Sequence, residues 1–183
     1  MTKSKVTEVE IGADYLIHKN SNHITYADNF RLTSYKLDYF PEPKDLMIAF
    51  FLSFPKSFKI LLNTREFIAK FFGLKTAPKT EKGSRLKELY QFKGNIGDKI
   101  AIFEVQDKNE NELLTGQKDS HLDFKLSFLS FKRNNAIRLE LATTVIINNT
   151  LGKIYFKIVK PFHKFYLKRI LKKMEIKLIN KSW

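Results

Sequence analysis

The chain has no cysteine and little glycine, proline or tryptophan, with 7, 5 and 1 of these among its 183 residues. The absence of cysteine excludes disulfides, thiolate-bound zinc and cysteine nucleophiles. The motifs Gly-x-Gly-x-x-Gly, Gly-x-x-x-x-Gly-Lys-Ser/Thr and Gly-x-Ser-x-Gly are also missing. These gaps argue against a dinucleotide-binding domain, a P-loop enzyme and an esterase of the common hydrolase fold.

Long apolar runs are missing as well. The longest fully apolar run covers residues 46–52, far short of the roughly 20 residues that a membrane-spanning helix needs. The first ten residues are polar and mixed in charge, whereas a signal peptide has an apolar stretch there. We therefore predict a cytoplasmic protein, and the lack of cysteine is compatible with that compartment.

Negative charge is scarce relative to positive charge. Lys and Arg number 33 against 19 Asp and Glu, which gives a net charge of +14. Such a balance favours anionic partners. However, 27 of the 33 are lysines, and phosphate recognition favours the bidentate fork of arginine. We interpret the charge mainly as solvated surface, and without a recognisable nucleic-acid module we do not expect nucleic acid as a partner.

Aromatic residues are plentiful, at 14% of the chain with 17 Phe and 7 Tyr. The length suits one domain over residues 1–183. We place its core at about residues 20–180, with residues 1–19 as an N-terminal extension or an additional strand.

The hydrophobic pattern changes period along the chain. A period of two predicts strands and a period near 3.6 predicts helices. A strand is predicted over 23–34, short helices over 45–52 and 55–72, an exposed loop over 75–87, further strands over 96–105, 112–116, 121–132 and 137–147, and a long helix over 153–179. The Asn134-Asn135 pair predicts a tight turn between the last two strands, and Pro161 should kink or divide the long helix.

This order predicts an α+β helix-grip fold. A curved antiparallel sheet would wrap around the long C-terminal helix, with two short helices after the first strand. Folds of this kind often keep a cavity between sheet and helix, and aromatic side chains would line it. The order therefore favours binding of a small apolar or amphipathic ligand.

Several motifs resemble the bacterial family known as domain of unknown function 2867. They are Tyr26-Ala27-Asp28-Asn29-Phe30, Phe72-Gly73-Leu74-Lys75, His121-Leu122-Asp123-Phe124-Lys125, Thr144-Val145, Leu151-Gly152-Lys153-Ile154-Tyr155 and Pro161-Phe162-His163-Lys164. The resemblance covers about residues 20–172. It implies a fold similar to the START and Bet v 1 superfamily of helix-grip domains and brings no assigned activity.

The chain departs from that family in two ways. Lysine stands at 125, 153 and 164, where the family usually has arginine, which weakens any role that needs a bidentate guanidinium. The strand count is also below the superfamily norm. We therefore expect one more strand, in 89–94 or near the N-terminus.

Polar residues near these motifs are the candidate site. His121 and Asp123 lie two apart in a predicted strand, so their side chains should share a face and could act as a general base. With His163 they are the candidate catalytic residues. The candidate ligand-binding residues are Tyr26, Asp28, His121, Asp123, Lys125, Tyr155, Phe162, His163 and Tyr166. The competing interpretation is architectural, in which the same motifs fix a strand end and a helix kink.

No cofactor or metal is expected. His18 and His23 lie near Asp14, but without a regular ligand spacing.

Three functions therefore remain open. Ligand binding between sheet and helix leads. The first alternative is an enzyme of the cyclase or hydratase type using His121 and Asp123. The second is binding of an anionic membrane or nucleic acid through the basic C-terminal helix.

The long helix has two contrasting sides. Apolar residues at 155, 158, 159, 162, 165, 166 and 170 fall opposite lysines at 153, 157, 160, 164 and 168. A core helix and a membrane-surface helix share this pattern, and we predict that the apolar side packs in the core.

Overall fold

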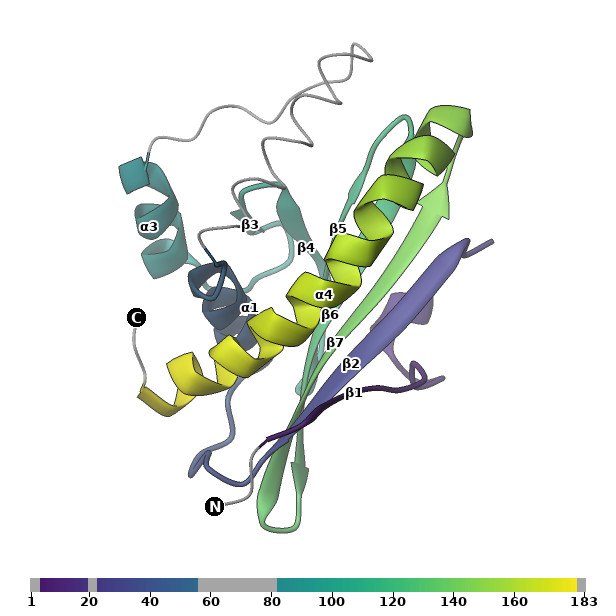
Figure 1. The fold of residues 1–183 in the computed structure, drawn as a ribbon. Coiled ribbons are helices and arrows are strands. Elements are labelled where there is room, and N and C mark those ends of the chain that lie inside the picture. Colours follow the sequence, from purple (N-terminus) through teal and green to yellow (C-terminus); the bar gives the residue numbers. More distant parts are fainter. Residues whose placement is uncertain (1–3, 20–22, 56–81, 181–183) are drawn as a thin grey trace.

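The structure is a computed structural model that describes residues 4–19, 23–55 and 82–180. One sheet of seven antiparallel strands has the order β1-β2-β7-β6-β5-β4-β3. Its strands are β1 (Val6–Glu8), β2 (Tyr26–Ser34), β3 (Lys99–Ile100), β4 (Phe103–Lys108), β5 (Glu112–Lys118), β6 (Leu122–Arg133) and β7 (Ala136–Ile147). The helices are η1 (Leu16–His18), α1 (Pro43–Leu52), α3 (Lys82–Gln91) and α4 (Thr150–Asn180). Figure 1 shows α4 crossing one face of the curved sheet, with α1 beside it. The predicted helix-grip arrangement is confirmed.

The core lies between this face of the sheet and the two helices. Side chains alternate along each strand, so Phe30 on β2, Phe128 on β6 and Leu141 on β7 all point toward the helices and are fully buried. The C-terminal half of α4 packs on the core on the side opposite the sheet. Its buried side chains are Leu167, Ile170, Leu171, Met174 and Leu178.

The helix α1 is buried on almost every side. Leu46, Met47, Ala49 and Phe50 are at most 4% exposed, as expected for a helix that is apolar all round. It begins with a capping box between Glu42 and Asp45 that includes the Glu42 backbone N–H donating to Asp45 Oδ2 at 3.2 Å. The short helix predicted at 45–52 is therefore confirmed, two residues longer at its start.

Several sequence predictions need correction. The exposed loop predicted to end at 87 is replaced from Lys82 by α3, which also covers the start of 89–94, one of the two places where an extra strand was expected. Good helix formers at 85–90 outweigh Gly83 there. The single strand predicted over 96–105 is two strands, because Ala101 turns the chain with a φ of 55°. Apart from Pro55, the helix predicted over 55–72 lies outside the described residues.

The remaining elements agree with the pattern. The extra strand expected near the N-terminus is β1, which pairs with β2. The turn at Asn134-Asn135 joins β6 to β7, and Asn134 has a φ of 47°. Pro161 does not divide α4, which runs unbroken over 31 residues and curves along its length (Figure 1).

The opposite face of the sheet is covered by the N-terminal segment. Glu112 accepts hydrogen bonds from the backbone N–H groups of Leu16 (2.8 Å) and Ile17 (3.3 Å) and from the Ser127 hydroxyl (2.5 Å). Burial raises the pKa of Glu112 above its ordinary value. The second buried glutamate, Glu140, accepts the Tyr15 hydroxyl at 3.0 Å. Two carboxylates thus fasten the segment around η1 to this face.

Tyr15 makes this attachment sensitive to high pH. Burial and the Glu140 carboxylate raise the pKa of Tyr15 from 10.0 to about 12. The unfolded state loses this proton first, so the Tyr15 contribution to stability is fully present below pH 10 and is lost as the pH rises toward about 12. We expect an ultraviolet absorbance titration to show a late tyrosinate transition that Tyr15→Phe removes in part. A late transition unchanged in that variant would contradict the assignment, and Tyr90→Phe, at an exposed site, is the control.

Candidate functional site

A polar cluster lies beneath the N-terminal half of α4. It contains Tyr26 and Asp28 from β2 and His163 from α4. The period of two in β2 places both β2 side chains on the helix-facing side. The Asp28 side chain is fully buried, and His163 Nε2 lies 3.3 Å from Asp28 Oδ2. The Tyr26 hydroxyl donates to the same oxygen at 2.5 Å.

Tyr26 remains protonated within this cluster. Burial, together with the hydrogen bond to Asp28, raises the pKa of Tyr26 well above its ordinary value. Its ring packs edge-on against Phe156 with centroids 4.9 Å apart, and Lys160 Nζ lies 4.8 Å from the ring centroid. Tyr26 is therefore a constant hydrogen-bond donor to Asp28.

His163 has a second ring nitrogen besides the one that faces Asp28. When Nε2–H donates to Asp28, Nδ1 is left as an acceptor. The side chain is 21% exposed, whereas that of Asp28 is not exposed at all. A buried carboxylate that orients an imidazole suits either proton transfer or binding of a polar group.

A buried hydroxyl without a partner lies beside the cluster. Thr143 on β7 is paired with Asp28 in the sheet and is 4% exposed. No described residue gives its Oγ1 a hydrogen-bond partner. Buried polar groups are nearly always satisfied, so this hydroxyl is a candidate contact for a polar group of a bound molecule. The sequence offered one signal for Thr143, which is a polar residue at a core-facing position in the alternation of β7.

The other candidate residues are brought to different places. The His121 ring packs edge-on against Tyr155 of α4, with centroids 5.4 Å apart. The Asp123 carboxylate instead accepts from the Asp119 backbone N–H at 3.1 Å and from Asn148 Nδ2 at 3.2 Å. The expected shared face of His121 and Asp123 is therefore wrong, because β6 begins only at Leu122 and strand alternation does not apply to His121.

Three further candidates lie away from the polar cluster. Lys125 donates from Nζ to the Lys19 backbone carbonyl at 2.7 Å, and burial followed by Lys118 lowers its pKa. It therefore belongs to the face of the sheet opposite α4. Phe162 is 48% exposed. Tyr166 is half-buried against the core, beside the ring of Phe165.

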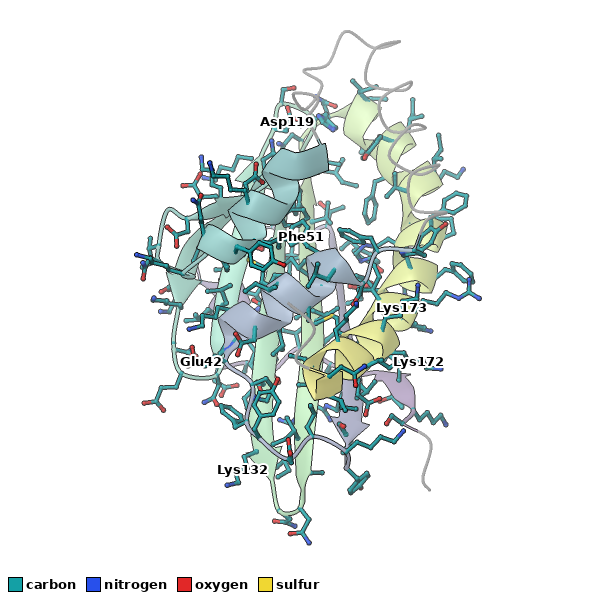
Figure 2. All side chains as sticks on the ribbon, turned by 90° about the vertical axis from the view of Figure 1, so that its left-hand side faces the viewer. Glu42, Phe51, Asp119, Lys132, Lys172 and Lys173 are labelled. Carbon is teal, nitrogen blue, oxygen red and sulfur yellow. The ribbon has the colours of Figure 1, made fainter. Side chains whose placement is uncertain are left out.

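The motif residues around His121 form a tightly bonded corner. Asn149 caps α4, its Oδ1 accepting the Gly152 N–H at 2.9 Å, and donates from Nδ2 to the Ser120 carbonyl at 3.0 Å. Asn148 donates its backbone N–H to the His121 carbonyl at 3.0 Å. Figure 2 shows Asp119 at the end of the sheet where α4 begins. This corner supports the architectural interpretation of these motifs.

No metal site is found in the described part of the chain. Within residues 4–19, 23–55 and 82–180, no three His, Asp or Glu side chains are grouped closely enough to hold an ion. Among the same residues, no helix is long and apolar enough to cross a membrane.

Fold and site together define an α+β helix-grip domain with a partly buried Tyr-Asp-His cluster beneath its long helix. The chain belongs to the family described as Protein of unknown function (DUF2867), whose model matches residues 21–170. No curated protein and no solved structure matches the chain. Similarity to the START and Bet v 1 superfamily stays a prediction.

Proposed function

We propose that this domain binds a small apolar or amphipathic molecule between the sheet and the N-terminal half of α4. The buried Thr143 hydroxyl, which has no hydrogen-bond partner among the described residues, carries the proposal. Leaving such a group unsatisfied costs about 1–3 kcal/mol, and a hydrogen-bonding group on a ligand would recover that energy. His163 and Asp28 supply further polar contacts nearby.

The packing of α4 supports this location. Side chains facing the sheet in its C-terminal half are at most 5% exposed, so that half of the interface is filled. In the N-terminal half the corresponding side chains are only half-buried: Tyr155, Phe156, Val159, His163 and Tyr166. An apolar molecule could bury more of their surface, at roughly 25 cal/mol per Å².

The neighbouring wall of the sheet is aromatic. Phe103 on β4 packs edge-on against Phe124 on β6 with centroids 5.3 Å apart, and against Phe51 on α1 at the same separation. Phe103 and Phe124 are half-buried. Aromatic walls around a few polar groups are typical of sites for small apolar ligands.

Native mass spectrometry of the purified protein, followed by denaturing extraction, is the first test. We expect a co-purified apolar or amphipathic compound near one-to-one stoichiometry. For an empty protein, titration with the fluorescent fatty acid dansyl-undecanoic acid replaces the extraction. The proposal would be overturned if no compound co-purifies and the probe shows no saturable binding.

Two matched variants locate the site. Successive residues of a helix point about 100° apart, so the half-buried Val159 lies nearer the sheet than Ile158, which is 42% exposed and faces away from it. We expect Val159→Trp to fill the site and weaken probe binding about tenfold. Ile158→Trp should leave probe binding unchanged. If the two variants unfold at similar temperatures and bind the probe with equal affinity, the probe binds at a different site.

A further inference from the structure

The outer side of α4 carries an unusual share of exposed apolar surface. Ten large hydrophobic side chains are exposed in the described part of the chain, and six of them lie on this helix. They are Ile154, Ile158, Phe162, Phe165, Ile176 and Ile179. Scattered single exposed side chains are ordinary, but a contiguous set marks an interaction surface.

Helix geometry aligns most of these side chains. At 100° per residue, four of them fall within roughly 40° of one another: Ile154, Ile158, Phe165 and Ile176. The side chains that contact the sheet fall on the opposite side: Phe156, His163, Leu167 and Met174. The apolar row therefore points away from the core, and the prediction that the whole apolar side packs inside is wrong for Ile158, Phe162 and Phe165.

The exposed charge that α4 itself carries is positive. The helix contains nine Lys and Arg residues and one acid, Glu175. Glu175 is 5% exposed and accepts the Ser4 hydroxyl at 2.7 Å, so it is not part of the exposed surface. Lys153 and Lys157 are exposed and form no ion pair with any other described residue. Lys172 and Lys173 continue the charge further along α4 (Figure 2).

We propose that α4 lies on membranes containing anionic lipid, with this outer face against the lipid. An apolar row bordered by lysines fits the membrane interface, where the apolar side chains enter the headgroup boundary and the lysines remain at the phosphates. Nucleic acid would use the charge but not the Ile and Phe row. The sheet already holds the other side of α4, so the helix can present this face without unfolding.

The experiment is co-sedimentation of the full chain with phosphatidylcholine vesicles, with and without about 30% phosphatidylglycerol. We expect binding to the anionic vesicles only, decreasing steeply when salt is raised to about 0.5 M. Binding equally well to neutral vesicles, or to neither kind, would overturn the proposal. So would retardation of DNA in the absence of vesicle binding.

Two pairs of variants separate this face from general effects. Ile158→Ser with Phe165→Ser should reduce vesicle binding roughly tenfold or more, while the exposed pair Ile96→Ser with Tyr90→Ser should not. Lys153→Glu with Lys157→Glu lowers the net charge from +14 to +10, as does the control of Lys36→Glu with Lys93→Glu. If a double variant on α4 and its control lose vesicle binding equally, this face is not responsible for the binding. Binding of dansyl-undecanoic acid should be unchanged in all four, so the proposal is independent of the ligand site.

Discussion

Replacing Glu140 by glutamine is expected to lower the free energy of unfolding by on the order of 3 kcal/mol. Its carboxylate is completely buried and lies 2.7 Å from Arg31 Nε and 2.9 Å from Arg138 Nε. It also accepts from Asn29 Nδ2 at 2.6 Å and from the Tyr15 hydroxyl. Glutamine keeps the shape but removes the charge, which leaves two partly buried guanidinium groups without their counterion. Its amide NH2 group also faces other donors, whichever carboxylate oxygen it replaces.

Urea unfolding followed by far-ultraviolet circular dichroism measures this loss. The matched control is Glu104→Gln, because Glu104 also forms a short ion pair, at 2.6 Å from Lys99 Nζ, but with both side chains about half exposed. Exposed pairs contribute about 0–1 kcal/mol, so this variant should unfold almost as the parent does. Similar small losses in both variants would mean that the buried network contributes little to stability.

The second large effect is expected at Gly152 in the first turn of α4. A Cβ atom there would lie 2.1 Å from the His121 carbonyl oxygen and 3.0 Å from its carbonyl carbon. Both partners are backbone, so no change of rotamer can relieve the overlap. We expect Gly152→Ala to destabilise the protein by about 3 kcal/mol, at the upper end of the usual cost of overpacking.

Thermal unfolding of Gly152→Ala tests the sign as well as the size of this effect. Alanine is a better helix former than glycine by about 1 kcal/mol, so helix propensity alone predicts a more stable protein. Lys153→Ala, exposed on the same turn, is the control and should change stability little. A rise in stability of Gly152→Ala would show that α4 is not held against His121 as tightly as the structure indicates.

These results bear on the meaning of the family motifs. The segment around His121 and the segment around Gly152 meet at the corner where β7 passes into α4. The side chains of Asp123, Asn148 and Asn149 there are occupied with capping and loop contacts. By contrast, Asp28 and His163, from two other motifs, form a pair that no loop contact requires. Functional variants should therefore begin with Asp28, Thr143 and His163.

Local pattern was sufficient for much of the fold. Strand alternation in β6 and β7, the turn at Asn134, the helix α1 and the extent of α4 follow from side-chain period and turn chemistry. These signals lie within short stretches of chain, where neighbouring residues determine backbone conformation. The candidate set also contained Tyr26, Asp28 and His163, although nothing in the sequence paired them.

Only the tertiary structure decided which residues meet and which are covered. His163 reaches Asp28 across 135 positions because α4 lies over β2, and Glu140 is buried because the η1 segment covers the far face of the sheet. Alternation assigns a residue to a face but does not say what packs on it. The sequence by itself determined the elements and the excess of positive charge on α4. Which side chains are buried depended on contacts between distant segments. The same contacts decided that the apolar row of α4 faces outward and that Thr143 has no partner among the described residues.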